Sequence, residues 1–206
     1  MRGTSQSFSY LWLCRLHSVT GVIFALAFVF CFLLPYSSVF NGAVAFDGSM
    51  AVRFAAPMLG WALVFFVLLP LIYHAAFGLM IVHGCQINSF KYNYYRNWMY
   101  ALQRVAGLLL IPFVVYHIYR TELAPAIGAG PLSFDAMHAI LAPAWAKWLY
   151  IIGIACAAFY IGNGIAMQSA TWGFAAARRA RSAAIIFGWI LTIVLAAWGI
   201  KIILSF

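Results

Sequence analysis

Two histidines stand deep inside apolar stretches and are the strongest candidates for chemistry in this sequence. His74 lies in LLPLIYHAAFGLMIV and His117 lies in AGLLLIPFVVYHIY. An ionisable ring is costly in such surroundings and is usually kept for a function. Small residues near both rings leave room for a flat macrocycle, although they also let helices pack closely. The alternative is that each neutral imidazole only hydrogen-bonds a neighbouring helix and stabilises the bundle.

The elements that carry these histidines are expected to be membrane-spanning helices. Of 206 residues, 67% are hydrophobic and 7% are charged, a balance that a soluble domain cannot shield from water. A stretch of about 20 apolar residues spans the hydrocarbon core, and lipid-exposed backbone must be paired within its own helix. The sequence predicts an all-α membrane bundle in a single domain (1–206), with five helices at roughly 17–38, 57–83, 100–120, 147–169 and 183–205.

The charged residues predict the orientation of the bundle. The segments before the first helix, between the second and third, and between the fourth and fifth contain basic residues and no acid: Arg2, Arg15, Lys91, Arg96, Arg104, Arg178, Arg179 and Arg181. The positive-inside rule therefore predicts an N-terminus inside and a C-terminus outside. We expect the protein in a bacterial cytoplasmic membrane. The three acids, Asp47, Glu122 and Asp135, are expected outside the membrane on the other side. Basic residues at helix ends indicate lipid headgroups or an acidic protein partner, not nucleic acid.

The other histidines and the cysteines are weaker candidates. His17 and His83 are expected at the cytoplasmic interface and His138 in an outer loop, where solvated roles are the rule. The four cysteines form no C-x-x-C pair, which argues against a zinc site or a disulfide framework. Phosphate-binding and nucleophile-elbow motifs are absent from the sequence.

Helical rise separates the two buried histidines in depth. At about 1.5 Å per residue, His74 lies about 14 Å from the inner boundary of its span and His117 about 26 Å from it. The two rings therefore differ in depth by about 12 Å and cannot be the two axial ligands of one haem.

Five segments together resemble the cytochrome b subunit of succinate:quinone oxidoreductases over nearly the whole chain. They are RLHSVTGVIF (15–24), LLPLIYHAAFGLMIV (68–82), NYYRNWMYALQRVAGLLLIPFVVYHIY (93–119), NGIAMQSATWGF (163–174) and WGIKII (198–203). The resemblance implies a five-helix anchor with two b haems and a quinone site, which docks a flavoprotein subunit and an iron–sulfur subunit on its cytoplasmic face. Such a subunit does not itself oxidise succinate. The resemblance favours menaquinone and leaves a higher oligomer of the complex open.

The resemblance also implies four axial histidines, one on each of the first four helices. His74 and His117 match the positions on the second and third helices. Phe32 and Tyr160 occupy the other two, so that His74 is expected opposite Tyr160 and His117 opposite Phe32. Phe32 has no donor atom, and an outer haem is therefore not expected. Tyr160 is an uncommon iron ligand, and Cys156, one turn before it, is a weaker alternative, so at most one inner haem, on His74, stays open beside a haem-free anchor.

Without a complete haem pair, the quinone is expected near the cytoplasmic end, where the iron–sulfur subunit docks. Hydrogen-bond donors and an aromatic wall are available there from Arg15, His17, Ser18, Gln103, Arg104 and Trp172. Each of these residues has an alternative role at the lipid headgroups or in the aromatic belt. Two other functions stay open: a di-haem cytochrome b of another dehydrogenase or a hydrogenase, and a small transporter, for which intramembrane acids or broken helices are expected.

Overall fold

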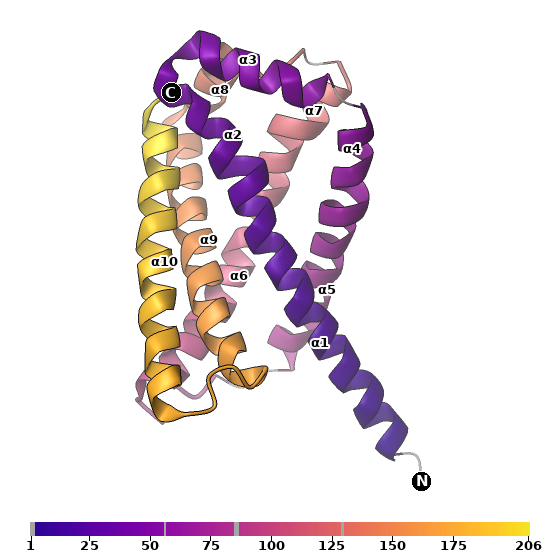
Figure 1. Cartoon of the computed structure of the whole chain (residues 1–206), viewed down its shortest axis with the longest axis vertical. Coiled ribbons are helices and arrows are strands. Elements are labelled where there is room, and N and C mark those ends of the chain that lie inside the picture. The colour runs from indigo at the N-terminus through magenta and orange to yellow at the C-terminus, as the bar shows by residue number, and fades with distance from the viewer. Residues whose placement is uncertain (1–2, 56, 85–86, 129) are drawn as a thin grey trace.

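The chain folds into a bundle of five long helices. The computed structural model describes residues 3–55, 57–84, 87–128 and 130–206, and these residues contain no strand. Five helical segments are long and apolar enough to cross a membrane: Tyr10–Asn41, Gly60–His83, Tyr95–Ala126, Ala144–Thr171 and Arg178–Leu204. This confirms the all-α class with five spanning helices. The termini lie at opposite ends of the bundle, called below the N-terminal end and the C-terminal end (Figure 1).

Each of the first three spans is interrupted by a π-helical turn. The first comprises α1 (Gly3–Ala27), a π turn (Phe28–Leu33), α2 (Leu34–Tyr36) and a 3₁₀ turn (Ser37–Asn41); the second comprises α4 (Pro57–Leu63), a π turn (Val64–Leu68) and α5 (Leu69–His83); the third comprises α6 (Tyr95–Ile118), a π turn (Tyr119–Leu123) and α7 (Ala124–Ala126). Pro35, Pro70 and Pro125 each follow a π turn by two residues. Proline lacks an N–H and its ring clashes with the carbonyl four residues earlier, which a wider turn accommodates.

The last two spans are straight helices in close contact. They are α9 (Ala144–Thr171) and α10 (Arg178–Leu204), which run side by side in Figure 1. A Cβ atom at Gly162 of α9 would lie 2.2 Å from the Gly188 carbonyl oxygen of α10, so only glycine permits this separation. Small residues at such crossings let helix backbones approach in lipid.

The helices extend beyond the predicted spans at the N-terminal end. The first helix begins at Gly3 instead of 17, and the third begins at Tyr95 instead of 100. Hydropathy locates the apolar part of a helix, whereas the helix itself continues through flanking basic residues that reach water along their apolar stems. His17 and Gln103 consequently lie within their helices and not at the start of them. In Figure 1, α1 crosses the bundle obliquely and its first turns project beyond the other helices.

Two short helices close the C-terminal end, and the sequence analysis predicted neither. They are α3 (Ala43–Phe54) and α8 (Phe134–Leu141), together called the cap (Figure 1). Phe46 and Met50 of α3 are fully buried, and Asp47 accepts a hydrogen bond from the Phe134 amide at 2.7 Å. His138 lies on α8, so its placement in a loop was wrong. A helix of 8 or 12 residues is too short to register as a spanning segment.

Candidate functional site

His74 lies at the centre of a hydrogen-bonded cluster in the interior of the bundle. Its side chain, on α5, is 8% exposed. The Tyr160 hydroxyl of α9 lies 2.9 Å from His74 Nε2, and the His17 carbonyl oxygen of α1 lies 3.0 Å from His74 Nδ1. A carbonyl can only accept, so Nδ1 carries the imidazole proton and Nε2 accepts from Tyr160. Thr20 adds its hydroxyl 3.2 Å from Nδ1. Three helices therefore meet at one ring.

The His17 ring is stacked on the His74 ring. The ring centroids are 4.0 Å apart and the planes differ by 10°. Two glycines make room for the pair, because a Cβ atom at Gly21 would lie 3.0 Å from the His74 ring and one at Gly78 would lie 3.3 Å from the His17 ring. The expected placement of His17 in solvent at the interface was therefore wrong. The reason is the early start of α1, which carries His17 into the bundle to the level of His74.

Amide side chains extend the cluster to the third and fourth spans. Gln103 of α6 donates to the Tyr160 carbonyl at 3.0 Å and accepts from Asn163 at 2.7 Å. Gln168 donates to the Ser18 carbonyl at 3.3 Å, and the Trp172 indole donates to the Ser18 hydroxyl at 3.3 Å. We call His17, Ser18, Thr20, His74, Gln103, Tyr160, Asn163, Gln168 and Trp172 the polar cluster.

Sequence reasoning missed Thr20, Asn163 and Gln168. A signal for the two amides was present, because Asn163 and Gln168 lie inside an apolar span as the two buried histidines do. In lipid, amide side chains favour partners on neighbouring helices. Thr20 gave no such signal, because a hydroxyl can bond to the preceding turn of its own helix, as Thr20 does to the Leu16 carbonyl at 3.0 Å.

Three predicted residues lie outside the polar cluster. Arg15 is exposed, and its guanidinium lies 5.5 Å from the centre of the Trp12 ring. Arg104 lies over the Tyr100 ring at 3.2 Å and donates to the Tyr100 carbonyl at 3.0 Å. Cys156 is half-buried and packs at the edge of the hydrophobic core. Its thiol is free, as are those of Cys14 and Cys31. Cys85 is outside the described residues.

The second buried histidine is surrounded by aromatic rings. His117 Nδ1 lies 3.3 Å from the Tyr150 hydroxyl of α9. The Phe32 ring meets the His117 ring edge-on, with centroids 5.3 Å apart, and the Tyr36 and Phe113 rings lie at 6.0 and 6.1 Å. Both predicted pairs, His74 with Tyr160 and His117 with Phe32, are thus brought into contact by the fold.

The residues at these two positions do not fit haem. Metal–imidazole bonds are about 2.0–2.1 Å long, so two axial donors of one iron lie roughly 4 Å apart. His74 Nε2 and the Tyr160 hydroxyl are 2.9 Å apart and bond to each other. The Tyr160 ring also fills the space beside Gly107, where a Cβ atom would lie 3.0 Å from it. At the other position Phe32 offers no donor.

An aromatic ring also fills the space beside His117, where the Phe113 ring lies 6.1 Å away. A Cβ atom at Gly153 would lie 2.3 Å from the Phe113 ring, so that ring takes the space that glycine leaves. Protein side chains therefore fill both positions at which the resemblance implies a macrocycle.

One acid lies on the helical segment that continues past the predicted third span. Glu122 belongs to the π turn of the third span and forms an ion pair with Arg53 of α3. Arg53 also donates to the Cys31 carbonyl, which lies four residues before Pro35 and so lacks its usual helical partner. Sequence hydropathy could not find this pair, because Arg53 comes from the cap. Glu122 is neutralised near the end of its span and does not indicate a transport path.

Replacing Arg53 by alanine is expected to destabilise the anchor by roughly 1.5–3 kcal/mol, the value for hydrogen bonds to a charged group. The change leaves Glu122 and the Cys31 carbonyl without their donor and frees α3 from two spans. Thermal denaturation of the purified complex in detergent measures the effect. Lys201→Ala, which removes an exposed cation at the same end, serves as the control. Equal stability of the two variants would contradict the role assigned to Arg53.

Comparison with known proteins identifies the family. The sequence model of the succinate dehydrogenase/fumarate reductase transmembrane subunit matches residues 86–197. The chain is 33% identical over 192 residues to the succinate dehydrogenase cytochrome b558 subunit of Bacillus subtilis (strain 168), which covers 93% of this chain and 95% of that protein. No solved structure gives a significant match. The chain therefore belongs to the transmembrane subunits of succinate dehydrogenase and fumarate reductase, and it is the membrane anchor of a succinate:quinone oxidoreductase.

Proposed function

We propose that this anchor passes electrons from an iron–sulfur subunit directly to a quinone bound in the polar cluster, with the N-terminal end of the bundle in the cytoplasm. The quinone takes up two electrons and two protons and leaves as quinol. The oxidation of succinate takes place on a flavoprotein subunit, so the anchor contributes the quinone site and not the dicarboxylate site. The resemblance to the family favours menaquinone.

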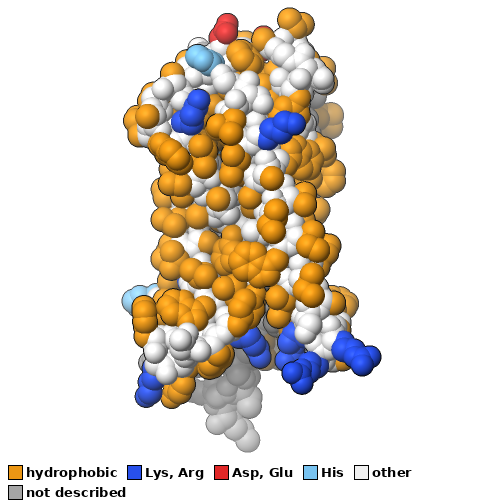
Figure 2. Space-filling model, turned by 90° about the vertical axis from the view of Figure 1, so that its left-hand side faces the viewer, with side chains coloured by type: hydrophobic (Ala, Val, Ile, Leu, Met, Phe, Trp, Pro, Cys, Tyr) orange, Lys and Arg blue, Asp and Glu red, His pale blue; other side chains and the backbone are white. Residues whose placement is uncertain are grey.

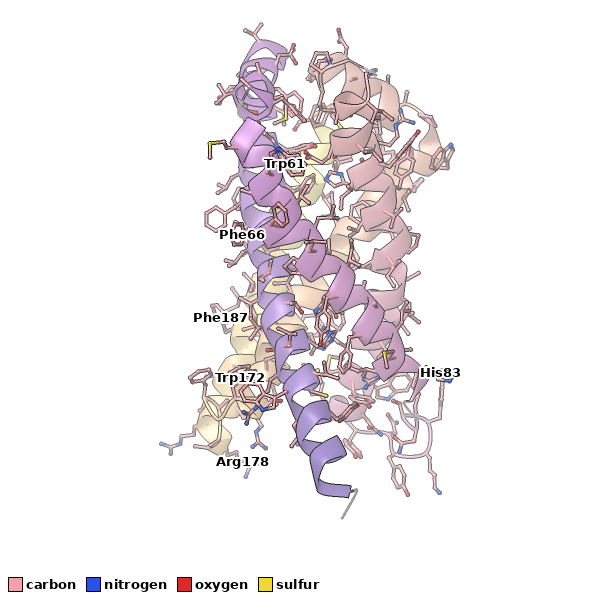
Figure 3. All side chains as sticks on the ribbon, turned by 90° about the vertical axis from the view of Figure 1, so that its right-hand side faces the viewer. Trp61, Phe66, His83, Trp172, Arg178 and Phe187 are labelled. Carbon is pink, nitrogen blue, oxygen red and sulfur yellow. The ribbon has the colours of Figure 1, made fainter. Side chains whose placement is uncertain are left out.

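The charge distribution supports docking at the N-terminal end. Basic residues gather there on the loops and helix ends without an acid among them, whereas the other end carries both signs. Figure 2 shows an apolar band between two charged ends, with blue side chains at both and a red one at the upper end. Figure 3 places His83, Trp172 and Arg178 in the lower part of the bundle, with His83 on the opposite side of the view from the other two. Basic residues at the cytoplasmic end of spanning helices follow the positive-inside rule. The same residues suit an acidic surface on the iron–sulfur subunit.

One observation above all carries the quinone site. The Nδ1 atom of His17 is buried and has no hydrogen-bond partner among the described residues. An unpaired buried polar atom costs about 1–3 kcal/mol. A quinone carbonyl that accepts a hydrogen bond from this nitrogen would remove that cost. The Phe77 ring, with its centroid 5.7 Å from that of His17, is an apolar aromatic neighbour of the kind that a quinone ring needs.

His17→Ala is expected to lower succinate:quinone turnover about tenfold, because the quinone loses a hydrogen-bond donor in a water-poor site. Succinate oxidation with an artificial electron acceptor should stay unchanged, since that reaction uses the soluble subunits alone. His83→Ala is the matched control, because His83 lies exposed at the same end of the bundle. Unchanged quinone turnover in His17→Ala would refute the proposed site.

The same preparation tests the partners. Mild detergent extraction of the tagged chain is expected to recover a flavin-containing subunit and an iron–sulfur subunit together with the anchor. Recovery of the chain alone, with succinate dehydrogenase activity in another fraction, would contradict the docking proposal.

A further inference from the structure

We propose that His74 and Tyr160 are positioning residues for the quinone site: they hold His17 in place from two neighbouring helices. This inference rests on the proposed function, because it takes His17 as the group that meets the quinone. It gives a role to the two residues at the inner haem position of the family, where the donor atoms of this chain bond to each other.

The geometry forms a directed chain of contacts. The Tyr160 hydroxyl donates to His74 Nε2 at 2.9 Å, which leaves the imidazole proton on Nδ1. His74 Nδ1 then donates to the His17 carbonyl at 3.0 Å. The same imidazole ring stacks on the His17 ring at 4.0 Å. His74 therefore fixes both the backbone and the side chain of His17, and Tyr160 holds the His74 ring from its other nitrogen.

Tyr160 is itself held at both ends. Its carbonyl accepts a hydrogen bond from Gln103 at 3.0 Å, and its ring packs against Gly107 and edge-on against Phe24, with ring centroids 6.0 Å apart. Its hydroxyl thus approaches His74 in a set direction. Without this hydroxyl, His74 Nε2 becomes a buried acceptor without a donor, and the imidazole is held only through its Nδ1 side. The ring can then turn away from the carbonyl and the ring of His17, and the position of His17 becomes less defined.

A positioning role for the Tyr160–His74 hydrogen bond and a purely structural role predict different experimental results. If the hydrogen bond only joined helices, its loss would lower stability and leave the quinone kinetics unchanged. A positioning role predicts a change in the KM for quinone even when the complex assembles normally. An iron-ligand role predicts a loss of haem absorbance.

The decisive variant is Tyr160→Phe, which removes the hydroxyl and keeps the ring against Gly107. The purified complex is expected to contain the same flavin per anchor as wild type, with a KM for quinone raised roughly three- to tenfold, the size expected for one lost hydrogen bond. Its rate with an artificial acceptor should not change. A pyridine haemochrome assay on both proteins should give the same value.

Tyr150→Phe is the matched control. Tyr150 lies on the same helix, and its hydroxyl bonds to the other buried histidine, His117, at 3.3 Å. This variant removes an equivalent hydroxyl away from the polar cluster, so its KM for quinone is expected to equal that of wild type. An equal rise in both variants would show a general effect on packing and overturn the inference.

Three outcomes separate the inference from the proposal beneath it. If His17→Ala impairs quinone turnover and Tyr160→Phe does not, His17 serves the quinone without help from Tyr160, and the inference is wrong. If neither variant affects turnover, the quinone site itself is elsewhere. If Tyr160→Phe or His74→Ala abolishes a haem absorbance present in wild type, Tyr160 and His74 bind iron, and the positioning role fails.

Discussion

Gly162→Leu is expected to lower the amount of anchor in the membrane about tenfold or more. A Cβ atom at this position would lie 2.2 Å from both the Gly188 carbonyl oxygen and the Thr192 hydroxyl of α10. The contact is equally tight seen from the other helix, because a Cβ atom at Gly188 would lie 2.5 Å from the Gly162 carbonyl oxygen. Leucine therefore forces α9 and α10 apart, and in lipid close packing is the main attraction between helices.

The measurement is an immunoblot of membrane fractions, followed by gel filtration of the extracted protein. Gly60→Leu is the control, because nothing lies within 4 Å of a Cβ at that exposed helical position. Both variants add the same side chain to a spanning helix. Normal accumulation of Gly162→Leu would show that the α9–α10 contact is looser than described.

The second prediction concerns how the reaction rate depends on the membrane potential. Moving one charge across the membrane changes its energy by about 2.3 kcal/mol per 100 mV, so a reaction that carries a full charge across changes its rate up to roughly fiftyfold. We expect no such change here. Protein side chains fill the position around His117, and the polar cluster lies toward the N-terminal end. Electrons and protons then reach the quinone from the same side, and no net charge crosses.

Succinate:quinone turnover in sealed proteoliposomes, under a potassium diffusion potential of either sign, tests this expectation. The rate with an artificial acceptor in the same vesicles is the control for leakage and orientation. A several-fold dependence of the quinone rate on potential would show that charge crosses the bilayer, and that the C-terminal half of the bundle contains a redox group.

Much of the fold could be predicted from the sequence because two simple quantities determine how helices are laid out across a membrane. The length of an apolar run fixes the number of spans, and helical rise fixes the depth of each residue, which is how His74 and His117 were assigned to different levels. The resemblance then named Tyr160 and Phe32 as their partners, and the structure places each beside its histidine. These inferences required no knowledge of side-chain contacts.

The remaining features depend on where helices begin and on contacts between segments far apart in sequence. His17 was placed too near the surface because hydropathy does not detect the polar turns that begin α1. The cap was missed because α3 and α8 are too short to span a membrane. The ion pair of Glu122 was not predicted because its partner, Arg53, is 69 residues earlier in the chain. The type and local sequence of each residue do not indicate which distant residue it contacts.

The π turns have a consequence for how relatives of this chain should be aligned. A π turn holds one more residue than an α turn while the helix before and after it stays regular. Deleting one residue from Phe28–Leu33 would therefore leave the downstream face of the first span pointing in its present direction. A deletion elsewhere in the span would instead rotate that face by about 100°, one residue of a 3.6-residue turn. Single-residue length differences among relatives should accordingly collect just before Pro35, Pro70 and Pro125.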